Sequence, residues 1–131
     1  TLLFNGFHIG AIAGHLTQIG YTSTFWSFVA GHSAMELTAI ALSGAAGLKL
    51  GFSILIPGRK TRYQSMLDAA RVSVKIMAGA MLMFFLAAFL EAFWSSSQTI
   101  PLMIKYAVGI ILWLLVFFYF LFAGRSIANE T

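Results

Sequence analysis

His32 and Glu36 are the residues of this chain whose types and spacing are best suited to chemistry. They lie four residues apart in the segment GHSAMEL, so they share one face if the segment is helical. Glu91 and His15 are further ionisable groups inside apolar stretches, and we expect the four to surround one small region. A divalent metal such as zinc is a candidate cofactor, with His32, Glu36 and Glu91 as ligands. A proton-linked or polar-ligand pocket, or mutual hydrogen bonding within a helix bundle, explains the same residues.

The chemistry of this predicted cluster stays open. No catalytic residue can be named, because no nucleophile constellation and no phosphate-binding loop accompanies these groups. The spacing HxxxE also differs from the HExxH pattern of zinc metalloproteases, in which a second histidine is needed.

The composition assigns the chain to the integral membrane proteins. Of its 131 residues, 60% are hydrophobic and 9% are charged, and the mean hydropathy is +0.88, outside the range of soluble domains. The net charge of +4 concerns membrane orientation rather than nucleic acid, because the basic residues flank apolar segments. The lipid bilayer is therefore an expected partner, and nucleic acid is not. The absence of cysteine excludes a disulfide framework or a thiolate metal site in this chain.

The hydrophobic pattern predicts an all-α, polytopic helical bundle that forms a single transmembrane domain over residues 1–131. A bilayer core of about 30 Å needs about 20 apolar residues per helix. We expect four spans and one short interfacial amphipathic helix, at about 1–19, 32–56, 72–94 and 102–123 for the spans and 59–70 for the interfacial helix. The chain starts inside an apolar run without an initiator Met, so we expect it to be the C-terminal part of a longer protein.

Basic residues predict the orientation. They concentrate around the connection between the second and third spans, as Arg59, Lys60, Arg62, Arg71 and Lys75. The positive-inside rule therefore places the connection 57–71 in the cytoplasm. Lys49 can extend its side chain toward that face, whereas Lys105, near the outer end of the fourth span, does not fit the rule.

Helix rise then predicts the depth of the two carboxylates. Glu36 and Glu91 should both lie about 30 Å from the cytoplasmic interface. This requires that the segment 59–70 does not extend the third span as one straight helix.

Glycines at spacings of three or four mark candidate packing faces, namely Gly6, Gly10 and Gly14 in the first span and Gly44, Gly47 and Gly51 in the second. Such glycines let two backbones approach closely in lipid, where the hydrophobic effect does not drive helices together. The pattern predicts a glycine zipper against a neighbouring helix. We expect that helix to come from a homo-oligomer or from other membrane subunits.

Three segments in order, NGFHIGAIAGHL, GHSAMELTAIALSGAAGLKLGFSILIPG and AAFLEAF, with a basic linker before the last, resemble the stage II sporulation protein M family of bacterial and archaeal membrane proteins. The resemblance covers most of residues 5–94, with Ser33 as a mild departure. It implies a bacterial or archaeal cytoplasmic membrane, a soluble region and further spans before Thr1, and a polar core of His32, Glu36 and Glu91. In the sporulation member it implies a membrane anchor that assembles with cell-wall hydrolases.

The sequence favours a non-enzymatic membrane scaffold or a subunit of a larger membrane complex, and it leaves enzymatic activity open. The first alternative is a transporter or proton-linked channel component, which needs an aqueous path to Glu36 or Glu91; no internal repeat supports it. The second is a membrane-embedded metal-dependent hydrolase using His32, Glu36 and Glu91, which needs a metal with an open coordination position.

Overall fold

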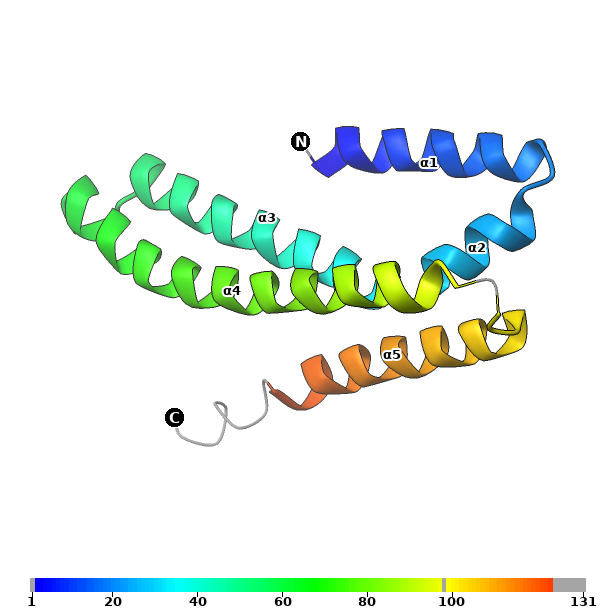
Figure 1. Cartoon of the computed structure of the whole chain (residues 1–131). Helices are drawn as coiled ribbons and strands as arrows, with labels where there is room; N and C mark the ends of the chain where they lie inside the picture. The colour runs from blue at the N-terminus through cyan, green and yellow to red at the C-terminus, as the bar shows by residue number, and fades with distance from the viewer. Residues whose placement is uncertain (1, 98, 124–131) are drawn as a thin grey trace. The chain divides into compact units, whose positions relative to one another are not determined.

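The structure, a computed structural model, describes residues 2–97 and 99–123. Residue 1, residue 98 and residues 124–131, which the predicted domain includes, lie outside the described residues. All regular structure in the described part is helical, so the predicted all-α class is confirmed. The elements in chain order are α1 (Leu2–Gln18), α2 (Thr22–Ala30), α3 (Ser33–Leu55), α4 (Arg62–Leu90), the π-helical turn η1 (Glu91–Ser95) and α5 (Leu102–Ala123), as Figure 1 shows.

The predicted count of four spans is too high for the described residues. Three helices there are long and apolar enough to cross a membrane, at Ser33–Leu55, Arg62–Ser95 and Leu102–Ala123. The predicted first span forms α1, which has 17 residues. At 1.5 Å per residue, α1 is about 26 Å long and falls short of a hydrocarbon core of about 30 Å.

The interfacial helix predicted at 59–70 is not a separate element. Residues from Arg62 onward form the first turns of α4, which continues into η1 as one helical stretch of 34 residues. The basic and polar residues at its start favour helix as well as the apolar residues that follow, and no Pro or Gly separates the two parts. The stretch is about 51 Å long, and the equal depth of Glu36 and Glu91 stays a prediction.

Residues 20–31 lie between the predicted first and second spans, and the structure forms α2 there, which the prediction did not include. Gly20 has a φ of +93°, a conformation that glycine adopts without steric cost, and it turns the chain between α1 and α2. The aromatic and hydroxyl side chains of α2 then bury Ser27 and place α2 against α5 and η1. Packing on these two elements explains a helix of 9 residues, which in isolation would be marginal.

The chain divides into two compact units. Unit 1 contains residues 1–35 and 87–131, and unit 2 contains residues 36–86. Unit 1 therefore holds α1, α2, the first turn of α3, η1 and α5, and unit 2 holds most of α3 and α4.

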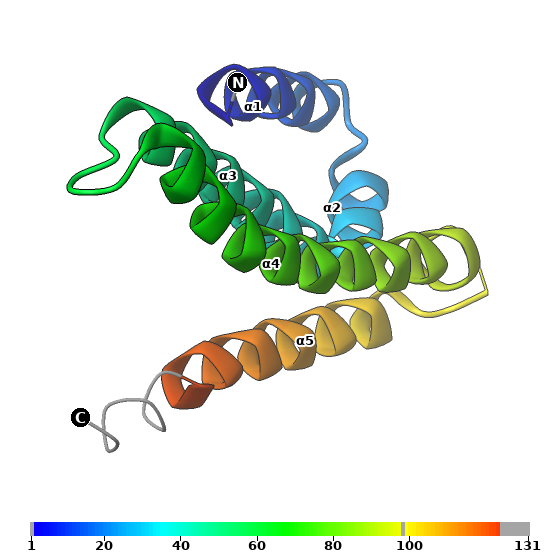
Figure 2. The ribbon, with the colours of Figure 1, turned by 90° about the vertical axis from the view of Figure 1, so that its left-hand side faces the viewer.

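Unit 2 is an antiparallel helical hairpin, with α3 and α4 side by side in both ribbon views (Figure 1 and Figure 2). α3 ends at Leu55, just before Pro57 and Gly58, and Gly58 turns the chain at a φ of +65°. The helices approach closely where the buried Ser73 hydroxyl donates to the Ala46 carbonyl at 3.1 Å. Small side chains at this point bring the two backbones within reach of one hydroxyl group.

Candidate functional site

A buried polar network lies in unit 1 where three elements meet. His32 comes from the junction of α2 and α3, Ser95 ends η1, and Lys105 lies in the first turn of α5. Their exposed fractions are 5%, 2% and 7%, so all three side chains are buried. We call these three residues the Ser95 network, because His32 and Lys105 each bond to Ser95.

Ser95 uses its side chain and its backbone for different partners. The Ser95 Oγ lies 3.2 Å from His32 Nδ1, and which atom donates depends on the histidine tautomer. The Lys105 Nζ donates to the Ser95 carbonyl oxygen at 2.8 Å. Ser95, a single residue of η1, therefore connects the α2–α3 junction to α5.

The position of Lys105 explains how its ammonium group is buried without an ion pair to a carboxylate among the described residues of unit 1. The last carbonyl groups of a helix have no partner within that helix. They also carry the negative end of the helix dipole, which favours a nearby cation. Ser95 is the last residue of η1, which continues α4, and Lys105 donates to its carbonyl. The helix end thus supplies the negative partner that an ion pair would otherwise supply.

One face of α5 carries the contacts of this junction. Lys105, Gly109 and Trp113 follow one another at intervals of four residues, so they form a stripe along the helix. Lys105 bonds to Ser95, and Trp113 Nε1 donates to Ser33 Oγ at 3.2 Å. Between these two bonds, α5 lies directly against the end of α2.

Glycine is required at two points of close approach. A Cβ at Gly109 would lie against the Ala30 carbonyl group, 3.0 Å from its carbon and 3.2 Å from Ala30 Cβ. A Cβ at Gly31 would lie 2.5 Å from Ser95 Oγ. Both distances are too short for a normal contact, so the two glycines let α5 and η1 approach the α2–α3 junction.

The residues of the predicted cluster lie on different elements. His32 is buried and its ring meets the Phe28 ring edge-on at 5.1 Å. Glu36 is half-buried and belongs to unit 2. His15 on α1 and Glu91 at the start of η1 are both exposed, and neither side chain bonds to His32 in unit 1.

The described residues contain no group of three or more His, Cys, Asp or Glu side chains arranged to hold a metal ion. The metal site of His32, Glu36 and Glu91 stays a prediction. What unit 1 does show is an imidazole, a hydroxyl, a carbonyl and an ammonium group in bonded contact. Such an arrangement fixes helix positions, because an unpartnered polar group in an apolar surrounding is costly.

Sequence reasoning did not select Ser95, Lys105, Gly31 or Gly109. Lys105 appeared only as an exception to the positive-inside rule, and this exception was a usable signal, since a charge within an apolar helix needs a partner. The pattern KxxxGxxxW, which places a cation, a glycine and an indole on one helix face, was the second signal.

Five of the six predicted packing glycines lie in open positions. Among the described residues, no atom lies within 4 Å of a Cβ built at any of Gly6, Gly10, Gly14, Gly47 and Gly51. Gly44 is half-buried. The glycine zipper with another helix therefore stays a prediction, and the small residue that does pack in the middle of α3 is Ala46.

The predicted basic positions are all exposed, namely Arg59, Lys60, Arg62, Arg71 and Lys75. Lys60 pairs with Asp68, the two side chains lying 2.6 Å apart and about half exposed. Exposed pairs of this kind contribute about 0–1 kcal/mol to stability. The exposed Lys60–Asp68 pair therefore contributes little to the stability of the fold.

Three comparisons with known proteins complete the description. The family model described as stage II sporulation protein M matches residues 1–96 of the 131-residue chain. The match ends one residue after Ser95, so it includes His32, Glu36 and Glu91 and stops before α5. A search among curated proteins and a search among solved structures each gave no match.

Proposed function

This chain belongs to the stage II sporulation protein M family, and from that premise we propose that it is a non-enzymatic membrane scaffold, a subunit of a larger membrane complex that assembles through α1. Three apolar helices and the family both support a membrane protein. The finer proposal depends on how α1 is arranged within unit 1.

The observation that carries the proposal is the uncovered surface of α1. Leu3 and Phe7 are 89% and 86% exposed, and Gly6, Gly10 and Gly14 meet no other described residue. The C-terminal end of α1 is held differently, because Trp26 Nε1 of α2 donates to Thr17 Oγ1 at 3.2 Å. One end of α1 is thus anchored to α2, while three turns of apolar side chains and glycines are available to another helix.

The Ser95 network supports the same function, because it holds α2, the helix to which α1 is anchored. Its bonds fix α2 relative to η1 and α5, and α2 in turn holds α1. A scaffold needs a binding element that is held in place before the partner arrives, because ordering it during association costs affinity. We infer that unit 1 presents α1 to a helix of a second copy or of another membrane subunit.

A single glycine substitution tests this proposal. Gly10→Leu fills the centre of the glycine stripe, so we expect the assembly to dissociate into single chains. The measurement is native gel electrophoresis of protein extracted from membranes with a mild detergent, after chemical cross-linking in the intact membrane.

Gly79→Leu is the matched control. Gly79 lies on α4, and a Cβ there also meets nothing within 4 Å among the described residues. This variant should leave the assembly intact. A wild-type chain that cross-links to nothing, or two variants that lose assembly equally, would contradict a scaffold role for α1.

The proposal includes an orientation. The connection 57–71 faces the cytoplasm of a bacterial or archaeal cell, because it carries the basic residues and the other connections of the described chain do not. Single cysteines at Thr61 and Ser96, in a chain without native cysteine, separate the two orientations. A membrane-impermeant thiol reagent added outside should label only the cysteine at position 96.

A further inference from the structure

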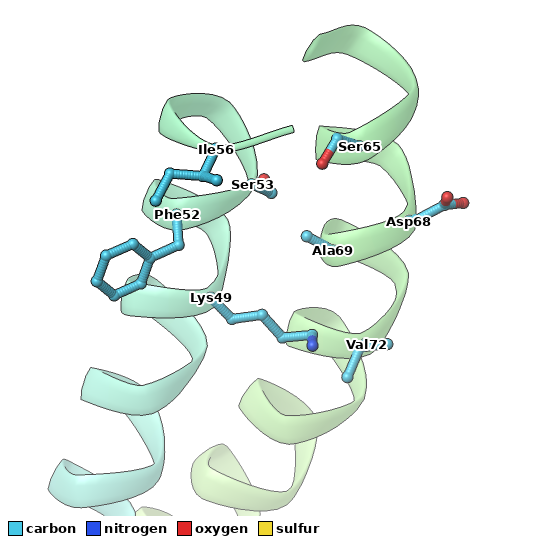
Figure 3. Close-up of a pocket in the computed structure, with 8 residues that line it drawn as sticks. All are labelled: Lys49, Phe52, Ser53, Ile56, Ser65, Asp68, Ala69 and Val72. Carbon is cyan, nitrogen blue, oxygen red and sulfur yellow. The ribbon is translucent and has the colours of Figure 1, made fainter. Parts of the chain in front are cut away.

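The groove between the ends of α3 and α4 has the chemistry of a lipid site. It has a volume of about 560 Å³ and is bordered by the last two turns of α3 and the first turns of α4 (Figure 3). Its borders combine a cation, Lys49, with a hydroxyl, Ser65, and with the apolar side chains of Phe52, Ile56 and Val72. We propose that this groove binds the phosphate headgroup of an anionic membrane lipid, with Lys49 as its countercharge.

Lys49 is the cation available to a ligand in this groove. Its side chain extends from α3 toward α4 and ends near Val72 (Figure 3). It is exposed, and no carboxylate of unit 2 lies within ion-pair distance of its ammonium group. It therefore differs from Lys105, whose ammonium group is buried on the Ser95 carbonyl.

Asp68 borders the same groove but does not neutralise Lys49. Its carboxylate points away from α3 (Figure 3) and pairs with Lys60 at 2.6 Å. Residues 57–75 contain five basic residues and this one acidic residue, so the region carries an excess of four positive charges. The groove consequently attracts an anion.

The two hydroxyl groups of the groove, Ser53 and Ser65, differ in whether they already donate a hydrogen bond. Ser53 Oγ donates to the Leu50 carbonyl at 2.7 Å, so its proton is already used. Ser65 Oγ makes no hydrogen bond within unit 2, and in Figure 3 it points toward α3. Ser65 can therefore donate to a phosphate oxygen in the groove.

The apolar border selects a lipid over a soluble anion. Phe52, Ile56 and Val72 are exposed beside the polar groups, and a free phosphate would leave them uncovered. An anionic lipid covers both parts, with its headgroup at Lys49 and its chains against the apolar side chains. Lys49 lies seven residues before Ile56, about 10 Å along α3, and its side chain can extend over part of that distance toward the headgroups.

Native mass spectrometry of the full chain in a neutral detergent tests this inference. Dioleoyl phosphatidylglycerol is added to one sample and dioleoyl phosphatidylcholine to another, and bound lipid is counted. We expect wild type to bind the anionic lipid more tightly, and Lys49→Gln to weaken this binding about fivefold. That change corresponds to about 1 kcal/mol for one lysine near a membrane surface.

Lys75→Gln is the matched control, because Lys75 is an exposed cation of the same region that does not border the groove. It should leave binding of phosphatidylglycerol unchanged. Ser65→Ala provides a second variant that keeps every charge, and we expect it to weaken binding about twofold. Equal losses in Lys49→Gln and Lys75→Gln, equal binding of the two lipids, or full displacement of phosphatidylglycerol by millimolar inorganic phosphate would each overturn the proposal.

Discussion

Each unit has a lysine within an apolar helix, and the lysine is buried in unit 1 and exposed in unit 2. In unit 1, Lys105 is 7% exposed and donates to the carbonyl of Ser95 at a helix end. In unit 2, Lys49 is exposed, and its side chain extends across a groove without a carboxylate partner in that unit. The same residue type therefore stabilises the protein at one position and is available to a ligand at the other.

The helix contacts of the two units differ in a related way. Unit 1 brings α2 and α5 together through glycines and fixes them with polar bonds, whereas unit 2 packs α3 on α4 through Ala46 and Ser73. In lipid, both small residues and interhelical hydrogen bonds stabilise helix pairs. Only the helix contacts of unit 1 combine close backbones with a buried cation, among the described residues.

The largest effect is expected from Gly109→Leu, because any Cβ at this position meets the backbone of Ala30. The backbone cannot rotate away as a side chain can, so we expect the α2–α5 contact to be lost. The free energy of unfolding should fall by about 3 kcal/mol. Gly79→Leu is again the control, with nothing within 4 Å among the described residues. Thermal unfolding followed by circular dichroism in detergent measures both variants. Similar midpoints for the two would show that the Ala30 contact is not needed.

The two lysines give the second prediction, which tests the comparison directly. Lys105→Met removes the bond to the Ser95 carbonyl, and we expect a loss of about 2 kcal/mol, since a hydrogen bond to a charged group contributes about 1.5–3 kcal/mol. Lys49→Met removes no bond of this kind, so its midpoint should match wild type in a neutral, lipid-free detergent. The measurement is the same thermal scan. Equal destabilisation by the two substitutions would remove the distinction between the units.

Much of the fold was accessible from the sequence. Hydropathy alone predicts helices close to α3 and α5, and Pro57 with Gly58 predicts the turn between α3 and α4. The pattern did not show that α4 begins at Arg62, because charged residues in its first turns resemble an interfacial helix. It also did not show α2, since a short helix of hydroxyl and aromatic residues is stabilised by its neighbours rather than by its own sequence.

The site was less accessible, for a physical reason. The type of a residue indicates that it needs a partner, but it does not identify the partner. His32 was selected as a residue that needs a partner, and one atom that its ring meets is the hydroxyl of Ser95, 63 positions away. Ser95 lies in a run of three serines that resembles a loop, and its importance comes from ending a helix beside Lys105.

The smallest change in stability is expected from replacing the two tryptophans of unit 1, Trp94 and Trp113, one at a time. Trp113 Nε1 donates to Ser33 Oγ, whereas Trp94 Nε1 is buried without a hydrogen-bond partner among the described residues. Trp113→Phe removes a bond, so we expect a loss of about 1 kcal/mol. Trp94→Phe removes an unsatisfied donor while keeping an aromatic ring, so the midpoint should stay or rise slightly. The thermal scan that follows both variants gives the sign for each. A larger loss for Trp94→Phe would mean that its indole nitrogen has a partner in the assembled protein, and the search for that partner would then move to the helix that binds unit 1.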